Sequence, residues 1–251
     1  MMNASAISPS RAIGRALLIS NDAVTIRLVG ESMQQLALHA EVCADIPTAL
    51  GLLNQRKFEA AIVDVGGDAK TVVEKIRLSP ANRTIVIFAI SDNDAEASEV
   101  LRVGASFVIR KPFSAVTIEN TLRTAYGSIV QERRRYFRCP VQIPASIRES
   151  GMPKTSGTVV NISASGLGIV ASELLKVGVK VRVQFTIPDG PSLFSVEATT
   201  CWCNEHYVGL QFVSLAPELQ SDLLDWLSRK LEENLPEEVA NKFRSPGNVQ
   251  L

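Results

Sequence analysis

The first half of the chain alternates short apolar runs with segments whose apolar residues recur at helical spacing. The apolar runs predict five strands, near residues 16–19, 41–44, 60–63, 84–90 and 106–109. The helical spacing predicts five helices, over about residues 23–38, 47–53, 70–78, 94–103 and 114–130. Strands that alternate with helices in this way are typical of an α/β domain with a doubly wound parallel sheet.

Beyond about residue 130 the period of the apolar residues changes to two. Alternating or short apolar runs cover residues 141–147, 158–162, 167–171, 180–187, 194–202 and 208–212. In the run 194–202, Trp202 shares the phase of the apolar residues Phe194, Val196 and Ala198. Polar turns are predicted at 151–157 and 188–191. Six or seven short strands predict a small antiparallel β-barrel. An amphipathic helix from Pro217 follows it.

This change of period divides the 251 residues into two expected domains, 14–130 and 131–235. Residues 1–13 and 236–251 are expected to be disordered tails. Lys and Arg number 26, as do Asp and Glu, so the formal net charge is zero. This balance argues against a nucleic-acid polymer as the partner. No apolar run approaches the ~20 residues of a membrane span, so we expect no membrane insertion.

The four cysteines are expected to be free thiols in a reducing compartment, which favours the cytoplasm. The sequence shows no nucleophile–base pair, no phosphate-binding glycine loop and no metal-ligand cluster. We therefore expect a protein that is not an enzyme, with no catalytic residues, no metal site and no cofactor.

Two motifs stand at predicted strand ends of the first half, where α/β sheets bind ligands. They are Phe58-Glu59-Ala60-Ala61-Ile62-Val63-Asp64 and Gly104-Ala105 followed by Lys111-Pro112-Phe113. Across residues 14–128 the chain resembles a response-regulator receiver domain. The resemblance implies a flavodoxin-like sheet, a phospho-acceptor at Asp64, the family lysine at Lys111 and a cis-proline after it.

Other positions depart from the receiver pattern. Ser20 and Asn21 align where the family has two acidic residues for Mg²⁺, and Ala89 aligns with its switch Ser or Thr. Because Mg²⁺ requires carboxylate oxygens, we expect its site to be lost and the domain to be degenerate. Two interpretations of Asp64 and Lys111 remain open. They form a structural ion pair, or Asp64 is a vestigial phospho-acceptor.

Four arginines lie within six residues at the domain junction, 133–138. Arg134 and Arg138 are four apart, and such a cluster repels itself unless an anion joins it. Guanidinium forks onto phosphate or the edge of guanine and stacks on flat rings. Farther on, Asn161 and Ser163 alternate onto one face of a strand, and Gly166 permits a positive φ or the close approach of a ligand.

Arg-x-x-x-Arg followed by Asn-x-Ser-x-x-Gly on a small barrel resembles the PilZ domain, over residues 132–233. Residues 207–212, Tyr-Val-Gly-Leu-Gln-Phe, resemble that family's last strand. The resemblance implies a receptor for the bacterial second messenger cyclic di-GMP. It implies that the ligand is bound by Arg134, Arg138, Asn161, Ser163 and Gly166, with Arg133 as an additional contact. We expect a mobile arginine arm that orders on binding and changes inter-domain or partner contacts.

Three alternatives remain. In the first, the arginine run is a solvated linker. In the second, the chain is a protein–protein interaction module, whose receiver-like domain forms a homodimer or docks an unidentified protein. In the third, the mixture of arginines and aromatic residues binds single-stranded nucleic acid. The sequence does not indicate the downstream process or the ligand stoichiometry.

Overall fold

The computed structural model describes residues 12–188 and 193–233. Residues up to Arg133 belong to one compact unit, and residues Arg134–Glu233 form a second. This division lies three residues beyond the boundary predicted between residues 130 and 131. The helix α5 (Ala115–Tyr136) runs across it.

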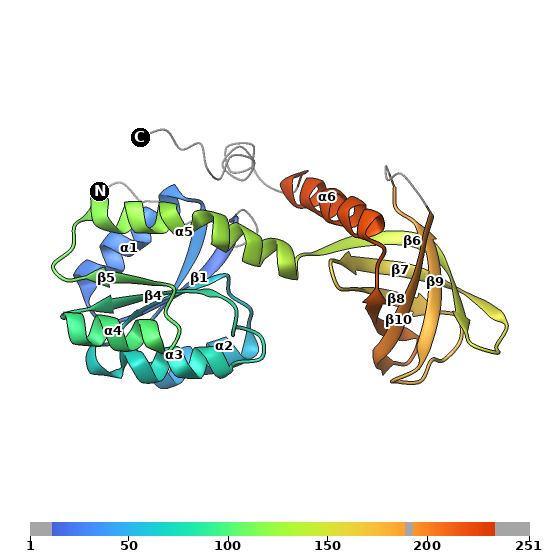
Figure 1. Cartoon of the computed structure of the whole chain (residues 1–251), viewed down its shortest axis with the longest axis horizontal. Helices are drawn as coiled ribbons and strands as arrows, with labels where there is room; N and C mark the ends of the chain where they lie inside the picture. Colours follow the sequence, from blue (N-terminus) through green and yellow to red (C-terminus); the bar gives the residue numbers. More distant parts are fainter. Residues whose placement is uncertain (1–11, 189–192, 234–251) are drawn as a thin grey trace. The chain divides into compact units, whose positions relative to one another are not determined.

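The first unit is a five-stranded parallel sheet between two layers of helices. Its order, β2-β1-β3-β4-β5, is the flavodoxin-like strand order. Figure 1 shows α1 and α5 over one face of the sheet and α2, α3 and α4 over the other. The predicted fold class is therefore confirmed for this half. The elements besides α5 are β1 (Gly14–Ser20), α1 (Ala23–Gln35), β2 (Leu38–Cys43), α2 (Ile46–Gln55), β3 (Ala60–Asp64), a 3₁₀ turn (Gly66–Asp68), α3 (Ala69–Leu78), β4 (Val86–Ser91), α4 (Asp94–Arg102) and β5 (Phe107–Arg110).

The central strands explain why the sequence shows continuous apolar runs rather than alternation. Every residue of β3 and of β4 is buried, because helices cover both faces of the sheet. Side-chain caps fix the starts of the helices. Asp22 accepts from the backbone at the start of α1, Asp45 does so for α2, and Asn93 for α4.

Two details at the beginning of the chain differ from the expectation. Helix α1 ends at Gln35 rather than near residue 38, because Ala37 adopts a φ of 56° and β2 begins at Leu38. Ala12 and Ile13, assigned to the disordered tail, are buried, and the Ile13 N–H donates to the Ala37 carbonyl at 2.8 Å. Residues 1–11 and the predicted tail 236–251 lie outside the described residues.

Helix α5 continues six residues past its predicted end and carries part of the arginine run. Arg133, Arg134 and Arg135 are helical, so the expected mobile arm is an ordered helix end in this structure. Glu132 accounts for the difference, since its buried carboxylate binds Lys57 and Thr84 of the first unit. Arginine and glutamate also have good helix propensity.

The second unit is a closed six-stranded barrel with the strand order β10-β11-β8-β7-β6-β9, which confirms the predicted barrel. Helix α6 follows the last strand (Figure 1). The hairpin between β6 and β7 is tighter than predicted, because Lys154 already pairs with Arg148. The turn predicted at 188–191 falls mostly on residues 189–192, outside the described residues. The bounds are β6 (Arg138–Glu149), β7 (Lys154–Ser163), β8 (Gly166–Ala171), β9 (Lys180–Thr186), β10 (Leu193–Asn204), β11 (Tyr207–Ser214) and α6 (Pro217–Glu233).

The barrel core is formed by alternate residues of all six strands, and α6 adds Leu223, Trp226 and Leu227 to it. Phe185 and Phe194 stack inside the barrel with ring centroids 5.3 Å apart. The indole N–H of Trp226 donates to the Pro188 carbonyl at 2.9 Å, which satisfies its buried donor.

Within the described ranges 12–188 and 193–233, the structure contains no helix of the length and apolar character needed to cross a bilayer.

Candidate functional site

A cavity of about 520 Å³ opens on the barrel surface, over strands β7, β8, β10 and β11. It is of the size that small-molecule sites have. Four of the six predicted ligand residues line it, which are Arg138, Asn161, Ser163 and Gly166. Its other lining residues are Ser165, Leu167, Gly168, Cys201, Trp202, Tyr207, Gly209, Leu210 and Gln211.

Two β-bulges turn key side chains toward this cavity. Between Thr200 and Trp202, strand β10 advances two residues while β11 advances one, so Cys201 is the extra residue. Trp202 therefore leaves the inward phase of the strand and is 44% exposed. The sequence-based placement of Trp202 with the core residues is wrong, because one bulge reverses the alternation. A second bulge in β7, at Val160, does the same for Asn161.

Three glycines make room for the polar and aromatic groups of the cavity. A Cβ on Gly168 would overlap the side chain of Asn161, and one on Gly209 would overlap the indole of Trp202. A Cβ on Gly166 would overlap the Leu210 carbonyl of β11. Gly166 has no positive φ, so glycine is needed there for the close approach of a neighbouring strand.

The two polar atoms of the Asn161 amide differ in their hydrogen bonding. Its amide Nδ2 donates to the Tyr207 hydroxyl at 2.8 Å, while its Oδ1 is buried and has no hydrogen-bond partner among the described residues. The ring of Tyr207 in turn contacts that of Trp202, with centroids 5.0 Å apart. An unpartnered buried carbonyl costs about 1–3 kcal/mol, so a side-chain movement that brings this oxygen to a ligand N–H would be favourable.

Ser163 and Arg138 bring the two motifs together. They are opposite residues of strands β6 and β7. Ser163 is 2% exposed and its hydroxyl donates to the Gly166 carbonyl at 3.1 Å, which closes the turn between β7 and β8. Arg138 is exposed, and its guanidinium forms no ion pair with any residue in 12–188 or 193–233.

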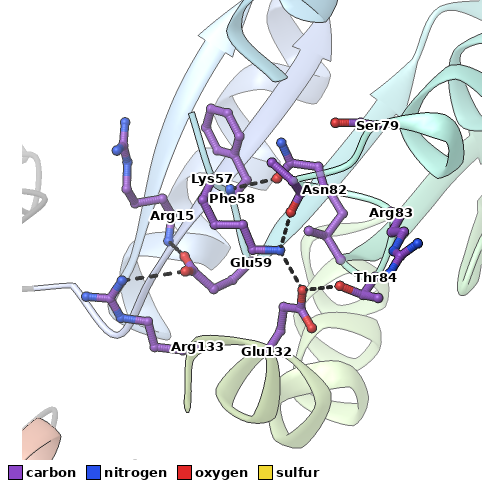
Figure 2. A network of polar contacts seen from close by, with 12 residues as sticks. Arg15, Lys57, Phe58, Glu59, Ser79, Asn82, Arg83, Thr84, Glu132 and Arg133 are labelled. Carbon is purple, nitrogen blue, oxygen red and sulfur yellow. Dashed lines mark hydrogen bonds and ion pairs between the residues drawn. The ribbon is translucent and has the colours of Figure 1, made fainter. Parts of the chain in front are cut away.

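The other two predicted arginines lie on the last turns of α5 and do not line the cavity. Arg133 belongs to the first unit, where its Nη1 lies 3.5 Å from Oε1 of the buried Glu59 (Figure 2). Arg134 begins the second unit and is partly buried. The structure thus brings Arg138 together with the Asn-x-Ser-x-x-Gly motif and leaves Arg133 with an internal partner.

The arrangement combines three kinds of recognition. Arg138 offers a fixed positive charge for phosphate, Trp202 offers an exposed ring for stacking, and Asn161 offers an acceptor for a base edge. Trp202 and Tyr207 were not predicted as site residues. The signal for Tyr207 was its place in the last-strand motif, whereas the position of Trp202 depends on a bulge that the apolar pattern does not reveal.

The strand ends of the first unit contain the second set of predicted residues, Asp64 and Lys111. The Lys111 ammonium lies 2.7 Å from Oδ1 of Asp64, and the Ser20 hydroxyl donates to Oδ2 at 2.9 Å. Burial alone would lower the pKa of Lys111, but the hydrogen bond and charge of Asp64 outweigh it and the pKa is raised. The peptide bond between Lys111 and Pro112 is cis, as the receiver resemblance implies.

The carboxylates near Lys111 are engaged by groups of the same unit. Both Asp64 oxygens already have partners, and the nearby carboxylate of Asp22 caps α1 through Val24 and Thr25. The described residues contain no group of three His, Cys, Asp or Glu placed to hold a metal.

The comparison with protein families bears on the second unit. Residues 132–229 match the model of the PilZ domain. The second unit, with its closed barrel and Asn-x-Ser-x-x-Gly strand, is therefore a PilZ domain. The chain as a whole joins a receiver-like unit of flavodoxin-like strand order to this PilZ domain.

Solved structures similar to this chain include receiver domains. One is the receiver domain of a sensor histidine kinase from Pseudomonas aeruginosa, at 18% identity, covering 45% of this chain and 98% of that one, with a TM-score of 0.41. Another is the chemotaxis protein CheY4 of Vibrio cholerae, at 22% identity, with the same coverages and TM-score. The inhibitor of motility MotI of Bacillus subtilis matches at 19% identity, covering 38% of this chain and 50% of that one, with a TM-score of 0.34. A comparison with curated proteins gave no match.

Proposed function

We propose that this protein is a non-catalytic receptor for cyclic di-GMP that needs no cofactor. PilZ domains are generally cyclic di-GMP-binding modules, and this one retains both motifs of the site. The observation that carries the proposal is the cavity in which Arg138, Asn161, Ser163 and Gly166 meet. We expect the protein to act in the cytoplasm, where its free thiols stay reduced.

The polar groups of the cavity suit a cyclic dinucleotide. Arg138 pairs with a phosphate or a guanine edge, and the unpartnered Oδ1 of Asn161 accepts from a guanine N–H. Trp202 stacks on a base, because its ring is exposed and lies close against Gly209. A dianion with two bases matches one exposed arginine beside an aromatic surface better than a long polyanion does.

Binding of the ligand would be transmitted through the arginine run. We propose that Arg133, Arg134 and Arg138 change partners when cyclic di-GMP binds, and that this changes the contacts between the units or with another protein. Small-angle scattering with and without ligand tests this step. An identical scattering profile at saturation would contradict it.

Calorimetric titration of the full chain with cyclic di-GMP tests the receptor function. We expect saturable binding, and no binding of a single-stranded oligonucleotide of mixed sequence under the same conditions. Absence of heat with tens of micromolar protein would favour the interaction-module alternative. Equal binding of the oligonucleotide would favour the nucleic-acid alternative.

A further inference from the structure

The end of helix α5, directly before the ligand motif, is tied to the first unit by two buried carboxylates (Figure 2). Glu132 belongs to the helix, is 4% exposed and accepts from the Lys57 ammonium and the Thr84 hydroxyl, both at 2.6 Å. Lys57 also donates to the Ala81 carbonyl at 2.8 Å. These short contacts anchor the helix end firmly.

The second carboxylate, Glu59, holds the helix end through Arg133. Glu59 is 1% exposed and stands directly before β3. Its Oε2 accepts from the Arg15 backbone N–H at 2.6 Å, and its Oε1 lies 3.5 Å from Arg133. Burial raises the pKa of Glu59, against the effect of the Arg15 hydrogen bond and of the charge of Arg133. The Arg15 hydrogen bond and the charge of Arg133 both favour the ionised form of this carboxylate.

The two ties differ in strength. The contact between Arg133 and Glu59 is long for a charge-assisted hydrogen bond, whereas the contacts of Glu132 are short. The Nε donor of Arg133 is also buried and has no hydrogen-bond partner within the part of the chain that the structure describes. Glu59 thus satisfies the guanidinium only in part, which makes it the partner that another anion can replace.

We propose that Glu59 is a positioning residue that lowers the affinity for cyclic di-GMP by holding Arg133 in the first unit. The inference rests on the proposed function and adds a determinant of affinity outside the cavity. The chain runs from Arg133 through Arg134 to Arg138, which lines the cavity. A phosphate of the ligand competes with the Glu59 carboxylate for the Arg133 guanidinium, while the contacts of Glu132 with Lys57 and Thr84 persist.

This competition gives the receiver-like unit an effect on the ligand site without phosphorylation. Since only the fraction of molecules with Arg133 released binds at full affinity, the apparent dissociation constant equals the intrinsic one divided by that fraction. Coupling of this kind is reciprocal, so ligand binding loosens the contact between Arg133 and Glu59.

The experiment is a calorimetric double-mutant cycle on the full chain with cyclic di-GMP. Glu59→Gln keeps an acceptor for the Arg15 N–H but removes the charge that holds Arg133. We expect it to bind roughly 3- to 30-fold more tightly than the parent protein. Arg133→Ala weakens binding, and in that background Glu59→Gln has no further effect, because the group that it releases is gone.

Glu41→Gln is the matched control, since Glu41 pairs with Arg15 and Arg56 in the same unit and does not contact Arg133. It should leave the affinity unchanged. If Glu59→Gln does not fold, Glu59→Asp retracts the carboxylate from Arg133 and should also tighten binding. Unchanged affinity in the folded Glu59 variants, or an equal gain with and without Arg133, would overturn the inference while the receptor function stands. Failure of the parent protein to bind would overturn both.

Discussion

The strand ends of the α/β unit and the outer face of the barrel are both places where polar side chains gather, but they differ in how those side chains are satisfied. At the strand ends, Asp64 has both oxygens engaged, by Lys111 and by Ser20. On the barrel, Asn161 has a buried oxygen with no partner among the described residues, and Trp202 presents an exposed ring. The first site is closed by the protein's own groups, and the second is open to a ligand.

The same difference extends to the residues around each site. At the strand ends, the Ser20 hydroxyl donates to Asp64, so a neighbour of the same unit satisfies this carboxylate oxygen. The barrel retains the opposite arrangement. Its glycines prevent side chains from filling the cavity, and its bulges turn polar and aromatic groups into it.

The largest effect on ligand binding is expected from Arg138→Ala. It removes a charge-assisted contact worth ~1.5–3 kcal/mol, so the affinity for cyclic di-GMP should fall roughly 10- to 150-fold. Thermal stability should hardly change, because Arg138 is exposed. Calorimetry measures the affinity, and Arg148→Ala, an exposed arginine farther along the same strand, is the control. Equal affinities of Arg138→Ala and the parent protein would place the ligand elsewhere.

Trp202→Ala is expected to have the next largest effect. Loss of a stacking surface costs ~1–3 kcal/mol per base, which corresponds to roughly 5- to 150-fold in the dissociation constant. Trp202→Phe keeps a ring over Gly209 and should lose much less. Titrations of the two variants check the difference, and similar losses in both would argue against stacking.

A smaller effect is expected from Tyr207→Phe. The ring and its contact with Trp202 remain, but Asn161 loses the hydroxyl to which its amide donates at 2.8 Å. Because one neutral hydrogen bond contributes ~0.5–1.5 kcal/mol, we expect a loss of affinity of roughly 2- to 12-fold. Asn161→Ala removes the acceptor itself, so it should weaken binding more than Tyr207→Phe does. The reverse order would contradict the role given to the Asn161 oxygen.

The closed site should affect stability and leave ligand binding unchanged. Lys111→Met leaves the buried Asp64 carboxylate without its cation and should destabilise the protein by about 1–2 kcal/mol, a value reduced by the partial exposure of Lys111. Thermal denaturation and cyclic di-GMP titration of the same sample check both parts. Asp64→Asn added to Lys111→Met should restore part of the stability. A large change in affinity would show that the two sites are not independent.

The sequence was sufficient to predict both folds, because the spacing of apolar residues differs between the two halves of the chain. The buried runs of β3 and β4 indicated a parallel sheet, and the alternation along β6 indicated a barrel strand. The motifs that resemble the PilZ domain also named four residues that line one cavity, and strand pairing brings them together by placing Arg138 opposite Ser163.

Other features depend on interactions that local patterns do not reveal. Trp202 faces the cavity because of a single extra residue at Cys201, and the end of α5 is ordered because Glu132 meets Lys57 75 positions away in the sequence. The partner of Arg133 is likewise far away in the sequence, at Glu59 directly before β3. Bulges and long-range ion pairs decide these positions, and both require the folded chain.

Hydrogen–deuterium exchange of the full chain, with and without saturating cyclic di-GMP, tests the central claim most directly. Binding in the barrel cavity should protect the backbone amides of residues 158–171 and 200–212, which include the turn between β7 and β8 and the hairpin of β10 and β11. The strand ends at Ser20, Asp64 and Lys111 should exchange at the same rate in both samples. Protection at those strand ends without protection of the barrel segments would contradict the account.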